Sequence, residues 1–184
     1  MRAVSGRVGT DIYMRNLFPD LYADLIPGIS AAGFSLGESF SNVSEEVGEV
    51  EWYGPEVPVR DILLKNNSWV GIKRRIGFGN ELLFSYRFMN EVVSLYFENA
   101  GRLYRISVGA GYFGRFNSVS VGDDLRSLER EFDVLFNDAD DDFLLKKFGS
   151  ILTGISFVTD YRASLEDAPE QVIKFISIHD WSLR

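Results

Sequence analysis

The sequence predicts an α+β, β-rich fold in which antiparallel sheet is accompanied by a few short helices. Residues 81–109 alternate polar and apolar side chains between turn-forming residues, which is typical of an antiparallel β-meander. Residues 117–132 (NSVSVGDDLRSLEREF) have an echo without gaps at residues 33–47 (GFSLGESFSNVSEEV). The length of 184 residues and the hydrophobic content of 46% suit a sizeable core. We therefore expect a single domain over residues 1–184, built from two tandem strand-helix-strands repeats.

The repeat sets the expected order of the elements. Gly37 aligns with Gly122, so each copy is expected to contain a short strand, a glycine turn with an acidic cap, and a helix. We expect Ser39 to cap the first helix, and Asp123 or Asp124 to cap the second. The expected halves are residues 29–78 and 113–160, joined by the meander at 81–109.

Two helices are expected outside the repeated motif. Leu17, Leu21 and Leu25 recur every four residues and predict a short amphipathic helix near the start of the chain. Near the end, the capping-box spacing of Asp167 and Glu170 predicts a helix over residues 167–179. Its apolar face would carry Val172, Phe175, Ile176 and His179.

The strands that follow the two predicted motif helices also look alike. Residues 49–53 alternate acidic and apolar side chains, as expected for an edge strand. Residues 61–65 (DILLK) match residues 142–147 (DFLLKK), and Val70-Gly71-Ile72 matches Thr153-Gly154-Ile155. We therefore expect the repeat to extend past its helix into matching strands.

Charge is distributed unevenly along the chain, whose net charge is −8. Residues 37–61 hold seven acidic and one basic residue, and residues 122–142 hold nine acidic and two basic residues. Residues 71–115 are basic, with seven basic against three acidic residues. An acidic protein repels nucleic acid and anionic membranes and attracts basic partners. We therefore expect a protein partner, with no nucleic acid and no membrane.

Two sequence patterns resemble ligand sites without meeting their requirements. Residues 109–114 spell GxGxxG, but a strand is expected after them instead of the helix that must hold a pyrophosphate. Residues 137–142 (NDADDD) alternate aspartates as a calcium loop does, but Phe143 lies where an EF-hand loop requires glycine. The sole histidine, His179, has no partner assignable from the sequence for nucleophilic or metal chemistry. We expect no cofactor, no metal and no catalytic residue.

Cellular location is inferred from what the chain lacks. It contains no cysteine, which fits a reducing cytoplasm. The first residues do not form a basic start followed by an apolar core, and no apolar run approaches the roughly 20 residues needed to cross a bilayer. We therefore expect a cytoplasmic protein.

The run of residues 92–157 carries a family resemblance. It contains the hairpin YFENAGRLYRISV, then GYFGRF, a Gly-Asp-Asp-Leu helix start, an FLL strand and a GISF strand. In this order it resembles the small, acidic, β-rich immunity proteins encoded beside toxins of bacterial contact-dependent inhibition and other polymorphic toxin systems. The glycine-turn-helix unit also resembles the repeats of β-lactamase inhibitory proteins and of small outer-membrane assembly lipoproteins, but this chain lacks the lipoprotein signal and cysteine.

The resemblance implies a stoichiometric inhibitor that binds a cognate toxin domain in the producer's cytoplasm. Many such toxins are nucleases with basic grooves, which an acidic inhibitor can occupy in place of the phosphate backbone. A metal-dependent hydrolase using the aspartates of residues 138–142 and an interaction module of another kind are the alternatives. The candidate partner-binding residues are Asp138, Asp140, Asp141, Asp142, Glu129, Glu131 and Asp133 in the second copy, and Glu45, Glu46, Glu49 and Glu51 in the first.

Overall fold

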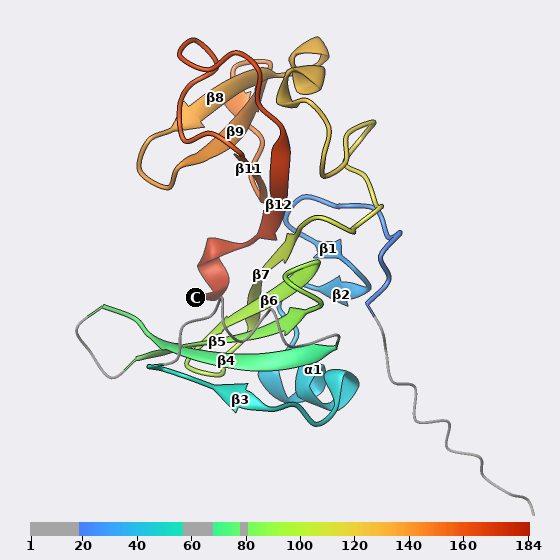
Figure 1. Ribbon diagram of the computed structural model, residues 1–184, viewed down its shortest axis with the longest axis vertical. Helices are drawn as coiled ribbons and strands as arrows, with labels where there is room; N and C mark the ends of the chain where they lie inside the picture. The colour runs from blue at the N-terminus through green and yellow to red at the C-terminus, as the bar shows by residue number, and fades with distance from the viewer. Residues whose placement is uncertain (1–18, 57–67, 78–80) are drawn as a thin grey trace, which may run out of the picture.

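A large sheet of mostly antiparallel strands runs the length of the molecule (Figure 1). The computed structural model describes residues 19–56, 68–77 and 81–184. The strand order is β10-β9-β11-β12-β7-β6-β5-β4-β3, with β8 pairing with β9. Among the described strands only β3 and β4 pair in parallel. The strands are β3 Trp52–Tyr53, β4 Trp69–Arg75, β5 Leu82–Phe88, β6 Val93–Glu98, β7 Leu103–Val108, β8 Asp133–Asn137, β9 Asp142–Lys147, β10 Ser150–Ile151, β11 Ile155–Thr159 and β12 Ile173–His179.

Short elements complete the described part of the chain. A hairpin of β1 (Ser30–Ala31) and β2 (Phe34–Ser35) precedes the α-helix α1 (Phe40–Val47). Two 3-10 helices follow later, η1 (Leu125–Arg130) and η2 (Trp181–Leu183). The expected α+β, β-rich class with antiparallel sheet and few short helices is confirmed.

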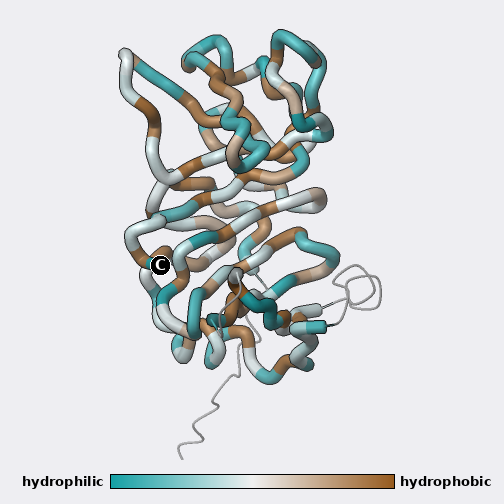
Figure 2. Tube along the Cα trace, turned by 90° about the vertical axis from the view of Figure 1, so that its left-hand side faces the viewer, coloured by the Kyte–Doolittle hydropathy of each residue, from teal (hydrophilic) through white to brown (hydrophobic). Residues whose placement is uncertain are grey.

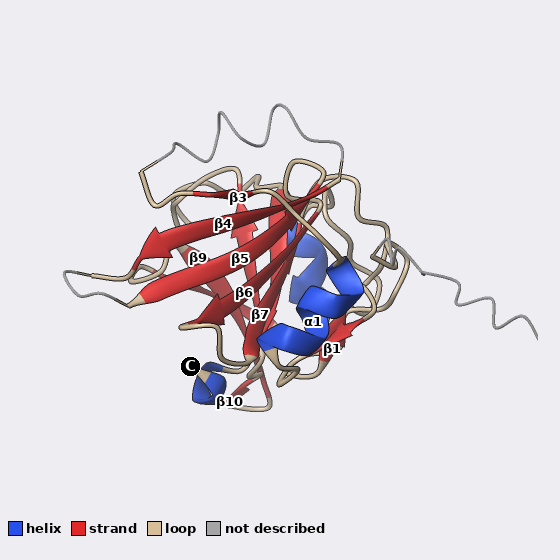
Figure 3. Ribbon diagram, turned by 90° about the horizontal axis from the view of Figure 1, so that it is seen from below, coloured by secondary structure: helices blue, strands red, loops and turns tan. Residues whose placement is uncertain are grey.

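The central strands occur where the alternation of polar and apolar residues predicts them. Strands β5, β6 and β7 fall within residues 81–109, β3 falls within residues 49–53, and β4 contains the Val70-Gly71-Ile72 segment that was expected to be a strand. Residues 61–65 lie outside the described part of the chain. Figure 3 shows α1 lying against one face of strands β4 to β7, so this face forms the core.

The aromatic ring of Phe40 anchors α1 to the sheet. Its ring centroid lies 5.4 Å from that of Phe84, 5.7 Å from Tyr86 and 5.2 Å from Phe97. The helix begins at Ser39, whose side chain accepts a hydrogen bond from the Asn42 backbone N–H. Ser39 is therefore the predicted cap, and it aims the apolar stripe of the helix at the strands.

The second motif folds differently from the first beyond its cap. Asp124 caps η1 by accepting from the Arg126 backbone N–H, as predicted. The element is a 3-10 helix of six residues, with Leu125 and Leu128 buried. Because a 3-10 helix has three residues per turn, these two leucines share one face. Phe132, which would follow them on one face of an α-helix, lies beyond the end of η1.

The turn that precedes each helix is built in the same way. The backbone N–H of Ser35 donates to Oε1 of Glu38 at 2.6 Å, and the backbone N–H of Ser120 donates to Oδ2 of Asp123 at 2.8 Å. Ser35 aligns with Ser120 and Glu38 with Asp123. The repeated letters therefore encode a repeated hydrogen-bonded turn.

Each turn is attached to a strand of the large sheet by a matching pair of hydrogen bonds. The Gly37 N–H donates to the Leu103 carbonyl, and the Leu103 N–H donates back to the Glu38 carbonyl, both at 2.8 Å. In the second copy the Gly122 N–H donates to the Ile173 carbonyl at 2.8 Å, and the Ile173 N–H donates to the Asp123 carbonyl at 3.0 Å. Leu103 begins β7 and Ile173 begins β12, so these two strands are structural equivalents.

The C-terminal helix predicted over residues 167–179 is wrong, because most of this segment is strand β12. Ile176 and Ile178 point into the core, and the strand lies between β11 and β7, hydrogen bonded to both. Its sequence IKFISIH is rich in β-branched residues, which fit a buried central strand. Asp167 and Pro169 lie in the loop before it.

The helix predicted near the start of the chain is also absent from its described part, residues 19–25. The Leu21 carbonyl accepts from the N–H groups of Phe113 and Gly114, and the Leu25 N–H donates to the Arg115 carbonyl. Backbone groups that a helix would have used internally are therefore bonded to a distant loop. Leu17 lies outside the described residues.

The pairing of the strands also corrects the extent of the repeat that the sequence match predicted. When β7 is matched to β12, the strand pairings of each unit give the equivalent residues of the neighbouring strands. Leu95 of β6 is then equivalent to Phe157 of β11, and Tyr86 of β5 is equivalent to Phe143 of β9. Strand β9 is thus equivalent to β5, whereas the sequence match had assigned it to residues 61–65. The match of Gly154 with Gly71 is likewise wrong. In its described residues each unit contains a turn, a helix and a meander of four strands. These strands are β4 to β7 in the first unit, within residues 34–108, and β8, β9, β11 and β12 in the second, within residues 119–179.

Candidate partner-binding surface

The predicted aspartate cluster forms the tip of the β8–β9 hairpin, at the top of Figure 1. Figure 2 shows hydrophilic residues gathered in the loops at this end. The Asn137 side-chain amide donates to Oδ2 of Asp140 at 3.1 Å and to Oδ1 of Asp142 at 2.9 Å. Asp141 pairs with Arg162 at 3.2 Å. Three of the four aspartates therefore have a partner in the fold, and Asp138 is exposed with no side-chain bond to the described residues.

The other predicted acids of the second copy lie on η1 and at the start of β8. Glu129 is 3.9 Å from Arg126, and Glu131 is 3.7 Å from Lys147. Both pairs are about half exposed, so water and salt screen them and each contributes little to the free energy of unfolding. Asp133 is exposed and starts β8. These carboxylates remain accessible to a partner.

A hollow of about 850 Å³ lies between this helix, the β8 strand and the loop of residues 162–169. Glu129 and Asp138 are on its wall, and Leu135, 39% exposed, is an apolar side chain on the same wall. The wall holds four carboxylates against two guanidinium groups: Glu129, Asp138, Glu166 and Asp167 against Arg126 and Arg162. This surface, the acidic hollow, combines apolar side chains with a net negative charge.

The predicted acids of the first copy lie at the opposite end of the molecule, beside α1 and β3 (Figure 1). Glu45 and Glu49 line a smaller hollow of about 450 Å³ next to Trp52. Burial, with the nearby Glu38 carboxylate, raises the pKa of Glu46 above its usual range. Glu51 is exposed. The structure thus keeps the two predicted clusters apart, so they form two surfaces and not one site.

The motifs that resembled ligand sites take part in packing and hydrogen bonding within the fold. Residues 109–114 form a loop in which the Tyr112 hydroxyl donates to the Ala23 carbonyl at 2.6 Å and accepts from the Ala32 N–H at 3.0 Å. His179 is nearly buried at the end of β12 and stacks on Trp181 with ring centroids 4.5 Å apart. Among residues 19–56, 68–77 and 81–184, no three His, Asp or Glu side chains converge in a way that could hold a metal ion.

Sequence reasoning missed a row of four serines on the face of the sheet that points away from α1. Ser94, Ser107, Ser177 and Ser156 lie directly opposite one another across β6, β7, β12 and β11. All four are almost inaccessible, at 1–4% exposure. The signal was present in the sequence, since each of these strands has one serine between two large apolar residues. Such a serine lies on the face opposite the core.

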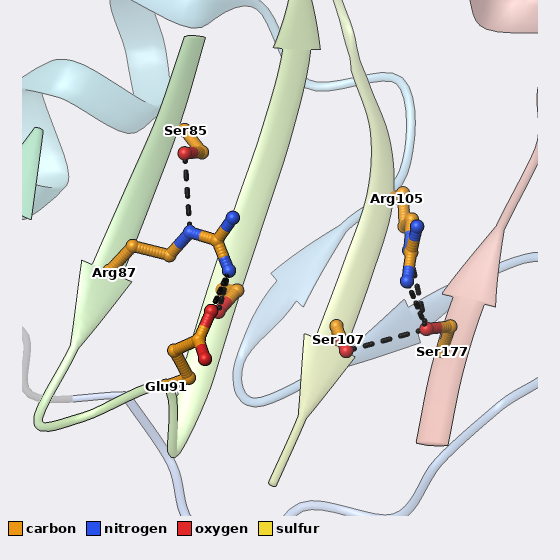
Figure 4. Close-up of polar contacts among 7 residues, drawn as sticks. Ser85, Arg87, Glu91, Arg105, Ser107 and Ser177 are labelled. Carbon is orange, nitrogen blue, oxygen red and sulfur yellow. Dashed lines mark hydrogen bonds and ion pairs between the residues drawn. The ribbon is translucent and has the colours of Figure 1, made fainter. Parts of the chain in front are cut away.

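Two arginines of the first unit, Arg87 and Arg105, bond to serines of this row (Figure 4). Arg87 bonds to Ser85 and Ser94 and forms an ion pair with Glu91, so its charge is neutralised locally. Arg105 donates from Nε at 3.2 Å and from Nη2 at 3.0 Å to the Ser177 hydroxyl. Within the described residues Arg105 has no carboxylate partner, unlike Arg87.

Comparison with known proteins yields little. No protein-family model matches the chain, and no curated protein sequence matches it. Among solved structures, the uncharacterized protein yfeY from Escherichia coli is similar at 14% sequence identity and a TM-score of 0.45, over 67% of this chain and 88% of that chain. A likeness at this level supports no inference about function. No helix in the described residues is long and apolar enough to span a membrane.

Proposed function

We propose that this protein is an immunity protein: a cytoplasmic, stoichiometric inhibitor that binds a cognate toxin domain, of the nuclease type, through the acidic hollow. The observation that supports the proposal most is the composition of that hollow. The exposed carboxylates of Glu129 and Asp138 line the same hollow as the side chain of Leu135, which is 39% exposed. The proposal assigns no turnover to the protein and no contact with nucleic acid.

An apolar centre with a charged rim is the arrangement that protein–protein interfaces use. The buried centre supplies binding free energy, while rim charges accelerate association with a partner of opposite charge. A nuclease domain presents cations where it holds phosphates. The carboxylates of the hollow can meet those cations, and Leu135 can fill an apolar recess between them.

The hairpin tip is held in one shape before any partner arrives. The amide of Asn137 bonds to two carboxylates, and its Oδ1 accepts from the Ala139 N–H at 3.3 Å. A preformed loop loses less conformational freedom on binding than a mobile one does. Asn137 is therefore a positioning residue for Asp140 and Asp142.

The test is rescue of growth by co-expression with the toxin domain encoded beside this gene, followed by kinetics with the purified pair. The expected result is a one-to-one complex and restored growth. The double variant Glu129→Gln, Asp138→Asn should slow association about tenfold or more at low salt and flatten its dependence on salt. Leu135→Ala should instead speed dissociation.

The matched control is the double variant Glu45→Gln, Glu49→Gln, which removes the same charge from the hollow at the other end. It should leave association within about twofold of the wild type. If this control slows association and the Glu129, Asp138 variant does not, the binding surface is on the first unit. If neither variant alters binding and the neighbouring toxin still kills, the immunity proposal is wrong.

A further inference from the structure

Arg105 is a cation held in place by its contacts, and one edge of its guanidinium has no hydrogen-bond partner in the described part of the chain. Its Nε and Nη2 atoms both donate to the Ser177 hydroxyl, and Ser177 in turn donates to the Ser107 hydroxyl at 3.3 Å. The guanidinium also lies over the Tyr96 ring, 4.9 Å from its centroid. Two hydrogen bonds and one stacking contact fix the plane of the guanidinium.

A fork of donors at the end of Arg105 bonds to none of the residues that the structure describes. A guanidinium has five N–H groups, and the serine occupies only the edge formed by Nε and Nη2. The remaining edge, formed by Nη1 and Nη2, has the spacing that binds the two oxygens of a carboxylate. Arg87 differs, because Glu91 already occupies its Nη1.

An apolar hollow of about 540 Å³ begins on the neighbouring strand. His179, which lies directly opposite Arg105 in the pairing of β12 with β7, is part of its wall. Ile151 and Trp181, each 48% exposed, and Leu144 supply apolar walls. Arg105 is not part of this wall, and its guanidinium is bonded to Ser177. Because the Cβ atoms of paired residues on adjacent strands are about 5 Å apart, an elongated molecule that passes His179 can reach both Arg105 and the hollow.

The charges near this hollow favour a ligand with a single negative charge at one end. Burial and the Arg105 charge lower the pKa of His179, so the imidazole is neutral at pH 7 and adds no second cation. Asp180, also on the wall, accepts two hydrogen bonds from Ser182 and keeps a negative charge there. Arg184, whose guanidinium lies 5.6 Å from the centroid of the Trp181 ring, is paired with Glu98, and Arg87 is paired with Glu91. Arg105 has no such partner among the described residues, so a monocarboxylate matches its single charge and can place its apolar part beside Trp181.

We propose that this face of the sheet binds a small monocarboxylate with an apolar body, its carboxylate on the free edge of Arg105 and its body in the hollow lined by Ile151 and Trp181. A hollow of a few hundred Å³ with apolar walls and one well-placed polar group is the usual form of a small-molecule site. The proposal is independent of the acidic hollow, which lies at the far end of the second unit (Figure 1).

The test is calorimetric titration of the full chain at pH 7 with octanoate, acetate and octan-1-ol. Octanoate should bind with a measurable Kd, at least about tenfold tighter than acetate, because it buries six more methylene groups. It should also bind about tenfold or more tighter than octan-1-ol, which lacks the charge. Equal affinity for octanoate and octan-1-ol would overturn the role of Arg105.

Two variants and a control separate binding from folding. Arg105→Gln should weaken octanoate about tenfold or more, while Arg115→Gln, an exposed arginine outside the site, should not. Ile151→Asp places a charge in the hollow at an exposed position, so it should abolish octanoate binding with the fold intact. If Arg105→Gln does not fold, the Ile151→Asp result decides, and wild-type affinity in that variant overturns the proposal.

Discussion

Ser107 and Ser177 are equivalent residues of the two units, and they hydrogen bond to each other across the boundary between them. Ser107 is the fifth residue of β7 and Ser177 the fifth of β12, and their hydroxyl oxygens are 3.3 Å apart. Exchanging the two units leaves the strand pairings unchanged: Ser94 pairs with Ser107 in the first unit as Ser156 pairs with Ser177 in the second. The two units are thus related by an approximate two-fold axis that passes between these serines.

The Ser177 hydroxyl should matter more to stability than the Ser107 hydroxyl. Ser177 accepts two bonds from Arg105, so Ser177→Ala leaves a half-buried guanidinium edge without its partner. We expect a loss of about 1–3 kcal/mol in the free energy of unfolding, measured by urea denaturation. Ser107→Ala is the matched control and should cost about 1 kcal/mol or less, since it removes one long hydrogen bond. Equal losses for the two variants would contradict this account.

The sequence predicted the meander, both helix caps and the repeated turn, because each depends on local patterns. Alternation identifies β5 to β7, and the capping side chains of Ser39 and Asp124 act within a few residues. It did not predict β12. In that segment the helical spacing of Val172, Ile176 and His179 competes with β-branched content, and pairing with β7, some 70 residues away, decides the outcome.

The candidate sites show the same division. The acids at the β8–β9 tip could be found from the sequence because charge clusters are visible there. Their distance from Glu45 and Glu49 could not, since sheet order places the two units end to end. The environment of Arg105 needed both Ser177 and His179 to be brought alongside from a strand that the sequence had suggested was a helix.

Gly154 should tolerate no side chain, for reasons of packing as well as backbone. Its φ is +85°, and a Cβ would fall on the backbone nitrogen and Cα of Gly28. Gly149 has nearly the same φ, +82°, but a Cβ added there would have nothing within 4 Å. We expect Gly149→Ala to cost about 1 kcal/mol from backbone strain alone. Gly154→Ala should cost at least about 2 kcal/mol more, seen as a lower urea midpoint.

The low pKa of His179 predicts how stability depends on pH. Burial, followed by the Arg105 charge, lowers the pKa below the ordinary 6.5, against smaller opposite effects of Asp142 and Asp180. The unfolded chain therefore binds a proton at a higher pH than the folded chain does. This contribution is fully present above the unfolded pKa and is lost as pH falls through the folded pKa.

Urea denaturation between about pH 7.5 and 5.5 measures this effect, because that window begins above the unfolded pKa of histidine. The wild type should lose stability on acidification. His179→Gln should show a flatter profile over the same window, whatever its absolute stability. A wild-type profile as flat as that of the variant would mean that His179 has the same pKa in the folded and the unfolded chain.

The Tyr112 hydroxyl should act as a structural bridge in the GxGxxG segment. It donates to the Ala23 carbonyl and accepts from the Ala32 N–H, and it therefore ties two parts of the N-terminal segment to the loop after β7. Burial raises the pKa of Tyr112 to about 12, so the phenol stays protonated and remains a donor throughout the physiological range. Tyr112→Phe should cost about 1–3 kcal/mol, because the ring stays in place while two backbone groups lose their partner.

Tyr22→Phe is the control: this tyrosine is 73% exposed, and its variant should stay within about 0.5 kcal/mol of the wild type in urea. Equal stability of the two variants would mean that water replaces the hydroxyl at both backbone groups, and the segment would then need another explanation for its attachment.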